Sequence, residues 1–367
     1  MSESTGTRPS VVVLGGGYGG IYAAKGLDQV ADVTLVDPSE AFHHNVASLR
    51  ALVQPEWLER IFFPYSQLLR HGRFLRDRAV AVDGRRITLA SGEQLEPDYL
   101  VLATGSSYPF PHKSDEPETA TARAKFRANH DELRGAGHVL LIGAGPAGLE
   151  LSGEIKAAFP EKRVTLVDVN PDILSGPYEQ ELRDELRRQL DKLGVELVLG
   201  SPIHALPEVP PGVAAPVSIT TEAGDTITAD IWFRCYGVSL QTGYLRGSLA
   251  QARDEHGYLR VDEFLRVDGA ERVYAIGDIS NADRNMAGWA GAQGQLVAAN
   301  LAAEITGEGE RKAYEPGPIA IILPLGPEGG AGQFPTGVVG PEQAAAIKGR
   351  DMLLDKFGEL FDVPAAA

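Results

Sequence analysis

The stretches VVVLGGGYGG (residues 11–20) and VLLIGAGPAG (residues 139–148) decide the fold that this sequence predicts. In both, a short apolar run with β-branched residues leads into a glycine cluster. This is the pattern of a buried parallel strand that turns sharply into a helix. After each helical stretch the chain returns to an apolar strand that ends in an acid, at Asp37 and at Asp168. The sequence therefore predicts two βαβ units of one design.

The spacing of the glycines is typical of a site for a dinucleotide. The first glycine permits the tight turn, the second lets the backbone approach a pyrophosphate, and the third lets helix and strand pack closely. The phosphates would bind free N–H groups at the helix start, where the helix dipole is positive. These roles fall on Gly15, Gly17, Gly20 and Asp37 in the first unit, and on Gly143, Gly145, Gly148 and Asp168 in the second.

The second acid also bears on which nicotinamide cofactor is used. A carboxylate at this strand end can accept both ribose hydroxyls of an adenosine, but it repels a 2′-phosphate. Asp168 therefore favours NADH over NADPH. The alternative, a solvated acid that leaves NADPH usable, stays open.

A late GD pair assigns the first unit to a flavin. Gly277 and Asp278 end the strand-like run VYAIGD, where a carboxylate can bind the ribityl chain of FAD. The FAD unit is then interrupted by the second βαβ unit, which is left for NADH. Besides the first glycine cluster, we expect the flavin site to include Asn45, Thr104, Gly105, Gly277, Asp278 and Gln295.

This order predicts an α/β protein with two Rossmann-like dinucleotide-binding domains of the glutathione-reductase type and a small C-terminal α+β region. The expected segments are 1–112 and 240–310 for the FAD domain, 113–239 for the NAD(P)H domain, and 311–367 for the C-terminal region. In the last region we expect a helix at about 351–361. Its apolar side would pack on the FAD domain, contact another subunit or cover the acceptor.

Composition and charge exclude several classes of function. With 34 basic and 50 acidic residues the net charge is −16, which repels nucleic acid and anionic lipid. The single cysteine, Cys235, excludes a disulfide, a CxxC redox pair and a cysteine-based metal site, and we expect no metal.

The sequence also bears on location. No apolar run is long enough to span a bilayer, the N-terminus has no signal-peptide core, and Ser2 stands where N-myristoylation requires glycine. We expect a cytoplasmic monomer or homodimer. Weak peripheral contact with the inner face of a membrane stays open.

Three further motifs carry a resemblance to a known family: SEAFHHNVASLR (39–50), LATGS (102–106) and GLELSGEIK (148–156). With them the chain resembles the pyridine nucleotide–disulfide reductase superfamily in its cysteine-free branch. More narrowly, it resembles the apoptosis-inducing-factor-like, ferroptosis-suppressor type of NAD(P)H:quinone oxidoreductase and the type II NADH dehydrogenases. The resemblance implies that NADH gives hydride to FAD, which passes two electrons directly to a quinone.

Catalytic roles for Glu150, His44 and Gln293 follow from the same resemblance. Glu150 would orient the nicotinamide and serve in a proton path, or would only complement a helix N-terminus. His44, or Asn45 beside it, would hydrogen-bond the flavin or give a proton to the quinone, or His44 would only satisfy backbone groups. Gln293, expected with Gln295 at a helix start, would stabilise reduced flavin, or would be a surface glutamine.

Two other functions stay open on the sequence. One is a flavin-dependent tailoring oxidoreductase that acts on an aromatic or quinonoid metabolite. The other is a slow-turnover flavoprotein for redox sensing or protein interaction.

Overall fold

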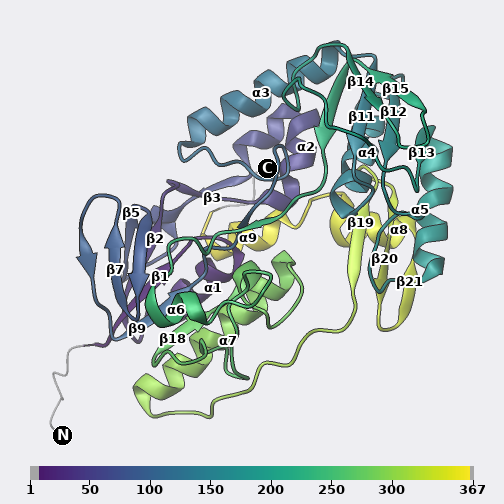
Figure 1. The fold of residues 1–367 in the computed structure, drawn as a ribbon. Coiled ribbons are helices and arrows are strands. Elements are labelled where there is room, and N and C mark those ends of the chain that lie inside the picture. Colours follow the sequence, from purple (N-terminus) through teal and green to yellow (C-terminus); the bar gives the residue numbers. More distant parts are fainter. Residues whose placement is uncertain (1–7, 364–367) are drawn as a thin grey trace, which may run out of the picture.

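The computed structural model describes residues 8–363, and the chain forms two lobes that are each built on a parallel sheet (Figure 1). The first sheet has the strand order β18-β9-β1-β2-β5, with all neighbours parallel. Its strands are β1 (Ser10–Leu14), β2 (Asp32–Asp37), β5 (Arg73–Arg76), β9 (Tyr99–Leu102) and β18 (Val273–Ala275). The edge strand β18 follows the whole second lobe in sequence, so the first lobe is discontinuous.

The second lobe repeats this design. Its parallel sheet has the order β13-β12-β11-β16. The strands are β11 (His138–Ile142), β12 (Arg163–Val167), β13 (Val195–Val198) and β16 (Ile231–Arg234). The central strands of both sheets are buried on both faces, which is why they are continuous apolar runs.

Helices cover the two sheets. In the first lobe α1 (Tyr18–Leu27) packs against α7 (Ala287–Thr306), and small residues allow the close approach: a Cβ on Gly294 would lie 2.2 Å from the carbonyl oxygen of Gly19. The other α-helices before residue 310 are α2 (Ser48–Val53), α3 (Thr119–Gly135), α4 (Pro146–Ala158), α5 (Gln180–Leu193) and α6 (Gly247–Gln251).

Short antiparallel strands complete the two lobes. The two crossings between the lobes pair with each other through β10 (Ser106–Ser107) and β17 (Ser239–Leu240). The remaining strands before residue 310 are β3 (Ala41–His43), β4 (Phe62–Pro64), β6 (Ala79–Asp83), β7 (Arg86–Leu89), β8 (Gln94–Leu95), β14 (Val217–Thr220) and β15 (Thr226–Ala229).

The C-terminal region contacts both lobes (Figure 1). Its antiparallel sheet of β19 (Ile321–Pro324), β20 (Gly330–Phe334) and β21 (Gly337–Val339) packs beside α4 and α5. Helix α8 (Pro341–Ala344) and a π-helical turn (Ala345–Gly349) follow, and α9 (Leu354–Leu360) then returns to the first lobe.

The structure corrects the expected helix at 351–361. Met352 and Leu353 have φ of +52° and +64°, in the left-handed region, so the chain turns there and α9 begins at Leu354. The turn is held in place because the side chain of Met352 is buried and its carbonyl oxygen accepts a hydrogen bond from His44.

The predicted fold class is confirmed: two Rossmann-type lobes with parallel sheets and an α+β C-terminal region. The segment boundaries at 112, 239 and 310 stay a prediction.

Candidate functional site

The two glycine clusters have the same geometry. Gly15 and Gly143 have φ of +101° and +113°, which a residue with a side chain rarely adopts. At the third glycines a Cβ would lie 1.8 Å from the Gly15 carbonyl oxygen (on Gly20) or 1.9 Å from that of Gly143 (on Gly148). Both helices therefore lie directly against their strand ends.

The second glycines, Gly17 and Gly145, differ from their neighbours. Among the described residues, no atom lies within 4 Å of the place where a Cβ would project from either one. Both are N-caps without a side-chain partner, at the N-termini of α1 and α4. Open space beside a helix N-terminus fits a pyrophosphate in both lobes.

The acids at the strand ends brace these clusters. Asp37 accepts hydrogen bonds from the backbone N–H of Gly16 (2.7 Å) and Ser39 (2.8 Å). Asp168 accepts them from Ala144 (2.6 Å) and Asn170 (2.8 Å) in the same pattern. Burial raises the pKa of Asp37, although its backbone hydrogen bonds lower it. Each carboxylate thus fixes its glycine cluster as well as ending the strand beside it.

A cleft of about 370 Å³ opens beside the first cluster, and we call it the flavin cleft. Its lining brings together most of the predicted flavin residues: Gly15, Gly17, Asp37, Asn45, Thr104, Gly105, Gly277 and Asp278. Except for Asn45, which lies in the short helix after β3, they lie at or just after the ends of β1, β2, β9 and β18. This is the carboxyl edge of the sheet, where ligands bind in such folds.

The sequence analysis missed a basic residue in this cleft. Lys113, from the crossing between the lobes, lies 3.3 Å from the Asp278 carboxylate and donates to the Ser106 carbonyl oxygen at 2.8 Å. The Ser106 hydroxyl donates to Asp278 at 2.5 Å. Three carboxylates line the cleft, Asp37, Asp115 and Asp278, so Lys113 supplies a positive charge there for an anionic cofactor.

Gln293 does not lie at a helix start. Helix α7 begins at Ala287, so Gln293 is in its second turn, and its side chain is only 2% exposed. Its Oε1 accepts a hydrogen bond of 2.7 Å from the backbone N–H of Gly277. Gln293 therefore holds the GD turn in position, and its catalytic role stays a prediction.

A second, smaller cavity of about 210 Å³ lies between α1, α7 and α9. We call it the α1–α9 pocket; its lining includes Tyr18, Tyr22, His44, Val46, Ala287, Gly288, Gly291, Ala292, Gln295, Leu353, Lys356 and Phe357. Tyr18, Val46 and Ala287 also line the flavin cleft, so the two cavities adjoin. His44 and Gln295 line the α1–α9 pocket and not the flavin cleft, whereas His43 and Asn45 line the flavin cleft.

His44 is fully buried and both ring nitrogens are engaged. Nε2 donates to the Met352 carbonyl oxygen at 2.7 Å, and Nδ1 accepts from the Tyr18 hydroxyl at 3.1 Å. That hydroxyl accepts in turn from the backbone N–H of Val46 at 3.1 Å. Burial lowers the pKa of His44 to about 4, so the ring is neutral at physiological pH.

Replacing His44 by asparagine is expected to reduce the pH dependence of stability in mild acid. The unfolded chain binds a proton at this position below its usual pKa of about 6.5. The folded ring stays neutral down to about 4, so wild type loses stability as the pH falls through this window. The full shift corresponds to about 3 kcal/mol. Urea unfolding between about pH 4 and 7.5 measures the slope.

The matched control for that experiment is His256→Asn, on an exposed histidine. Burial lowers the pKa of His43 to about 3, so His43 contributes to the pH dependence of stability in wild type and in both variants. A His44→Asn protein with the full wild-type slope would contradict the assignment.

Glu150, on α4, is paired with a residue that the sequence analysis did not single out. Lys348 in the π-helical turn donates to Glu150 at 2.7 Å, and both side chains are only 12% exposed. The positive charge of Lys348 also helps lower the pKa of His44. The IKGRD motif at 347–351 was visible in the sequence, but nothing in it showed a partner 198 residues away.

One turn further along α4, Glu154 forms a buried ion pair with Arg50 of α2. Both side chains are 1% exposed, and a second hydrogen bond joins them at 2.8 Å. Arg50 also donates to the Gly349 carbonyl oxygen at 2.9 Å. This ion pair therefore ties the first lobe, the second lobe and the C-terminal region together.

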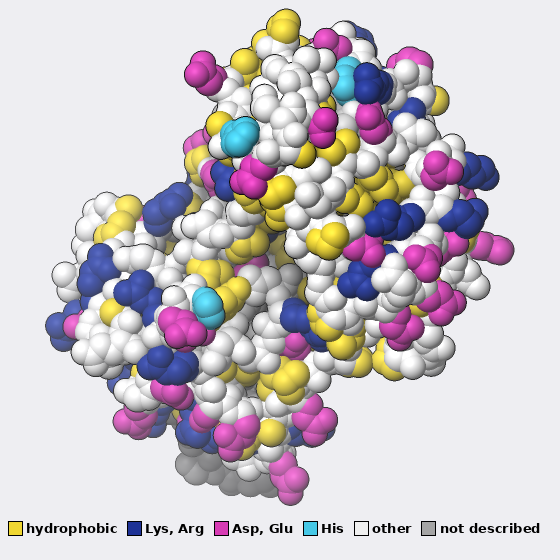
Figure 2. Space-filling model, turned by 45° about the vertical axis from the view of Figure 1, so that its right-hand side comes forward, with side chains coloured by type: hydrophobic (Ala, Val, Ile, Leu, Met, Phe, Trp, Pro, Cys, Tyr) yellow, Lys and Arg dark blue, Asp and Glu magenta, His cyan; other side chains and the backbone are white. Residues whose placement is uncertain are grey.

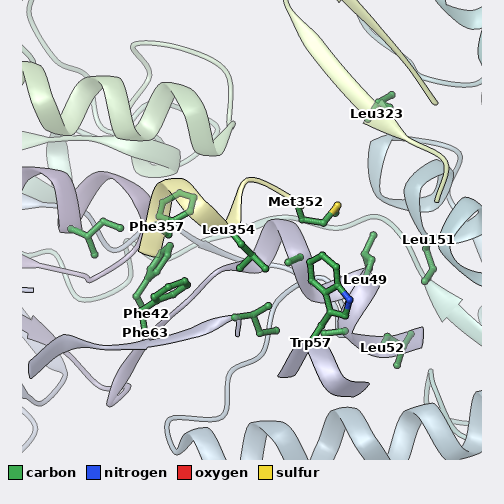
Figure 3. Close-up of a cluster of buried hydrophobic side chains, with 14 of the residues drawn as sticks. Phe42, Leu49, Leu52, Trp57, Phe63, Leu151, Leu323, Met352, Leu354 and Phe357 are labelled. Atoms are coloured by element: carbon green, nitrogen blue, oxygen red, sulfur yellow. The ribbon is translucent and has the colours of Figure 1, made fainter. Parts of the chain in front are cut away.

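Aromatic side chains hold α9 against the first lobe. Phe42 and Phe63 from β3 and β4 point toward Phe357 of α9, with Leu354 beside them (Figure 3). Phe42 also stacks on Phe361 with ring centroids 5.7 Å apart. Phe357 is the member of this cluster that lines the α1–α9 pocket, beside the polar groups of Tyr18 and His44.

The described part of the chain shows neither a metal site nor a membrane-spanning helix. Within residues 8–363 no group of His, Cys, Asp or Glu side chains is placed to hold a metal ion. No helix in that range combines the length and apolar character that a bilayer crossing requires. On the face drawn in Figure 2, basic and acidic side chains are interspersed, and hydrophobic ones gather in the hollow between the lobes.

Comparison with known proteins shows the family to which this chain belongs. A model of the family described as pyridine nucleotide-disulphide oxidoreductase matches residues 9–295. Ferroptosis suppressor protein 1 of Mus musculus is 32% identical over 352 residues, which cover 94% of this chain and 93% of that protein.

Two solved structures are similar in fold. The sulfide:quinone oxidoreductase of Aquifex aeolicus has a TM-score of 0.73 at 18% identity, covering 96% of this chain and 92% of that one. NDH2 from Plasmodium falciparum, in complex with NADH, has a TM-score of 0.73 at 14% identity, covering 93% of each chain.

Proposed function

Because the chain belongs to the pyridine nucleotide-disulphide oxidoreductase family and is an NAD(P)H oxidoreductase that uses FAD, we propose that its electron acceptor is a quinone. The observation that carries the proposal is the α1–α9 pocket, which adjoins the flavin cleft and has an apolar wall with hydrogen-bonding groups. The 32% identity to ferroptosis suppressor protein 1 supports it. NADH and a proton would reduce the quinone to a hydroquinone.

The two cofactors would occupy separate lobes. We assign 1–112 and 240–310 to FAD, 113–239 to NAD(P)H and 311–367 to the C-terminal region that completes the pocket. In the first lobe Gly15, Gly17 and Gly20 would receive the FAD pyrophosphate, with Asp37 toward the ribose and Asp278 with Lys113 toward the ribityl chain. Hydride acceptance and electron release are the chemistry that bound FAD supplies.

The chain's own residues would position the quinone and supply its protons. Gln295 offers an N–H toward the pocket, where it can bind one carbonyl oxygen of a quinone, and Tyr18 lines the same pocket with its O–H donated to His44. His44 is neutral and keeps the Tyr18 hydroxyl oriented. The charge of Lys348 reaches His44, and the Glu150–Lys348 pair would lead protons from solvent toward it.

For the nicotinamide cofactor we propose a preference for NADH. Asp168 presents a carboxylate at the strand end where a 2′-phosphate of NADPH would lie, and the neighbouring Asn170 donates its backbone and side-chain N–H to that carboxylate. Within the described residues no Lys or Arg makes an ion pair with Asp168.

Replacing Asp168 by asparagine is expected to raise the use of NADPH relative to NADH by about fivefold or more, because a like-charge contact at ~4 Å costs about 1 kcal/mol even in water. The amide oxygen can still accept from the Ala144 N–H, so the glycine cluster keeps its brace. The ratio of kcat/KM for the two cofactors is the measurement, and Asp191→Asn on the exposed side of α5 is the charge-matched control. An unchanged ratio in Asp168→Asn would rule out this residue as the selector.

The quinone itself is tested by steady-state reduction of a series of acceptors with NADH as donor. We expect quinones with and without a prenyl tail to be reduced, and the Gln295→Leu protein to have a raised KM for each of them. If small aromatic compounds without a quinone ring are reduced orders of magnitude faster, the quinone assignment fails.

A further inference from the structure

The entrance of the α1–α9 pocket carries a positive charge without a counter-charge. Lys356, on α9, lines the pocket and is exposed, and its ammonium lies 5.7 Å from the ring centroid of Tyr22 on α1. In the described part of the chain, no carboxylate lies within ion-pair distance of this ammonium, although the chain has a net charge of −16. The ammonium of Lys356 is therefore an unpaired cation beside a pocket that adjoins the flavin cleft.

The nearby acids do not neutralise Lys356 inside the pocket. Asp355 lines a different cavity, between α9 and β4, together with Phe62 and Phe63. Glu359, one turn along the helix, lines neither of these two cavities. His44 is neutral, so Lys356 supplies the positive charge among the pocket-lining side chains.

The rest of the lining suits one flat aromatic ring system. Tyr18, Tyr22 and Phe357 give it aromatic walls, and Gly288 of α7 leaves one side open, whereas the Tyr22 ring packs over Gly291. At about 210 Å³ the pocket takes a ring system but not a long tail as well. A ring held against Tyr18 would place its outer substituent toward Tyr22 and Lys356.

We propose that Lys356 selects quinone acceptors that carry an anionic group, a carboxylate, sulfonate or phosphate, on or next to the ring. This inference rests on the proposed quinone reductase function and deepens it. The cation–π contact with Tyr22 holds the ammonium at the entrance while leaving its N–H donors free for an anion. A partly exposed pair of this kind is expected to change selectivity by about fivefold.

The test compares two acceptors with the same ring system, 1,4-naphthoquinone-2-sulfonate and the neutral 2-methyl-1,4-naphthoquinone. The measurement is the kcat/KM of the sulfonate divided by that of the neutral quinone, with NADH as donor. In Lys356→Gln this ratio is expected to fall about fivefold, and in Lys356→Arg it should return to the wild-type value. In wild type, high salt should lower the ratio to that of Lys356→Gln. Lys192→Gln, on the exposed face of α5, makes the same change in net charge far from the pocket and should leave the ratio unchanged.

The outcomes separate the two proposals. If wild type reduces neither quinone although NADH reduces its flavin, the quinone reductase function fails. If wild type reduces both and the ratio is the same in Lys356→Gln, only the role of Lys356 is overturned. Weaker binding of Lys356→Gln to phosphatidylglycerol vesicles with an unchanged ratio would also overturn it, since the lysine would then contact an anionic lipid surface.

Discussion

Replacing Gly145 by valine is expected to abolish reduction by NADH while the protein still folds and still binds FAD. Apart from its chain neighbours, no described atom lies within 4 Å of a Cβ at this position, so the new side chain begins in open space. It projects instead into the space at the N-terminus of α4 where the pyrophosphate of NADH would lie. We expect the rate of flavin reduction at a fixed NADH concentration to fall by about 100-fold or more, because a displaced reactant alone can cost that much.

The matched variant is Gly17→Val in the first lobe. Gly17 has the same open surroundings at the N-terminus of α1, so valine there should give a folded protein that does not retain FAD. The flavin absorption of each purified variant and stopped-flow reduction by NADH distinguish the two losses. Loss of FAD from Gly145→Val with retention by Gly17→Val would reverse the assignment of the two lobes.

Replacing Arg50 by methionine is expected to cost about 3–5 kcal/mol of stability, because it leaves a buried carboxylate without its partner. Arg50 and Glu154 are both 1% exposed, and burial already raises the pKa of Glu154 while Arg50 pulls it down. The same change removes the hydrogen bond to the Gly349 carbonyl oxygen, next to Lys348. The free energy of unfolding in urea measures the loss.

Two further variants show whether the unpaired charge is the cause. Arg50→Met combined with Glu154→Leu removes both charges and should recover most of the stability, since apolar side chains of similar volume fill such sites well. Arg127→Met breaks an exposed pair with Glu59 and should cost about 0–1 kcal/mol. A double variant as unstable as Arg50→Met would show that packing, and not the ion pair, dominates here.

The two lobes could be predicted because their signals are local. Each βαβ unit is encoded within about thirty residues by an apolar run, three spaced glycines and an acid, and each of these has one physical role. The GD turn at Gly277 belongs to the same class of signal, since a short motif follows a strand. The structure adds that Gln293 anchors this turn through a hydrogen bond to the Gly277 N–H.

The parts that could not be predicted depend on contacts between distant segments. Apolar spacing at 352–361 is helical, but it cannot show that the backbone at Met352 and Leu353 turns to meet His44. Lys348 meets Glu150 across 198 residues and Arg50 meets Glu154 across 104. Adjacent positions such as His43 and His44 also face different cavities, which sequence adjacency alone does not reveal.

The most direct test of the central claim is an anaerobic titration of the purified holoprotein, followed by its absorption. We predict flavin bands near ~375 and ~450 nm, loss of the longer-wavelength band with one equivalent of NADH, and its prompt return when a quinone is added. A protein without flavin bands after reconstitution with FAD would contradict the account. So would one whose NADH-reduced flavin persists for minutes with quinone present.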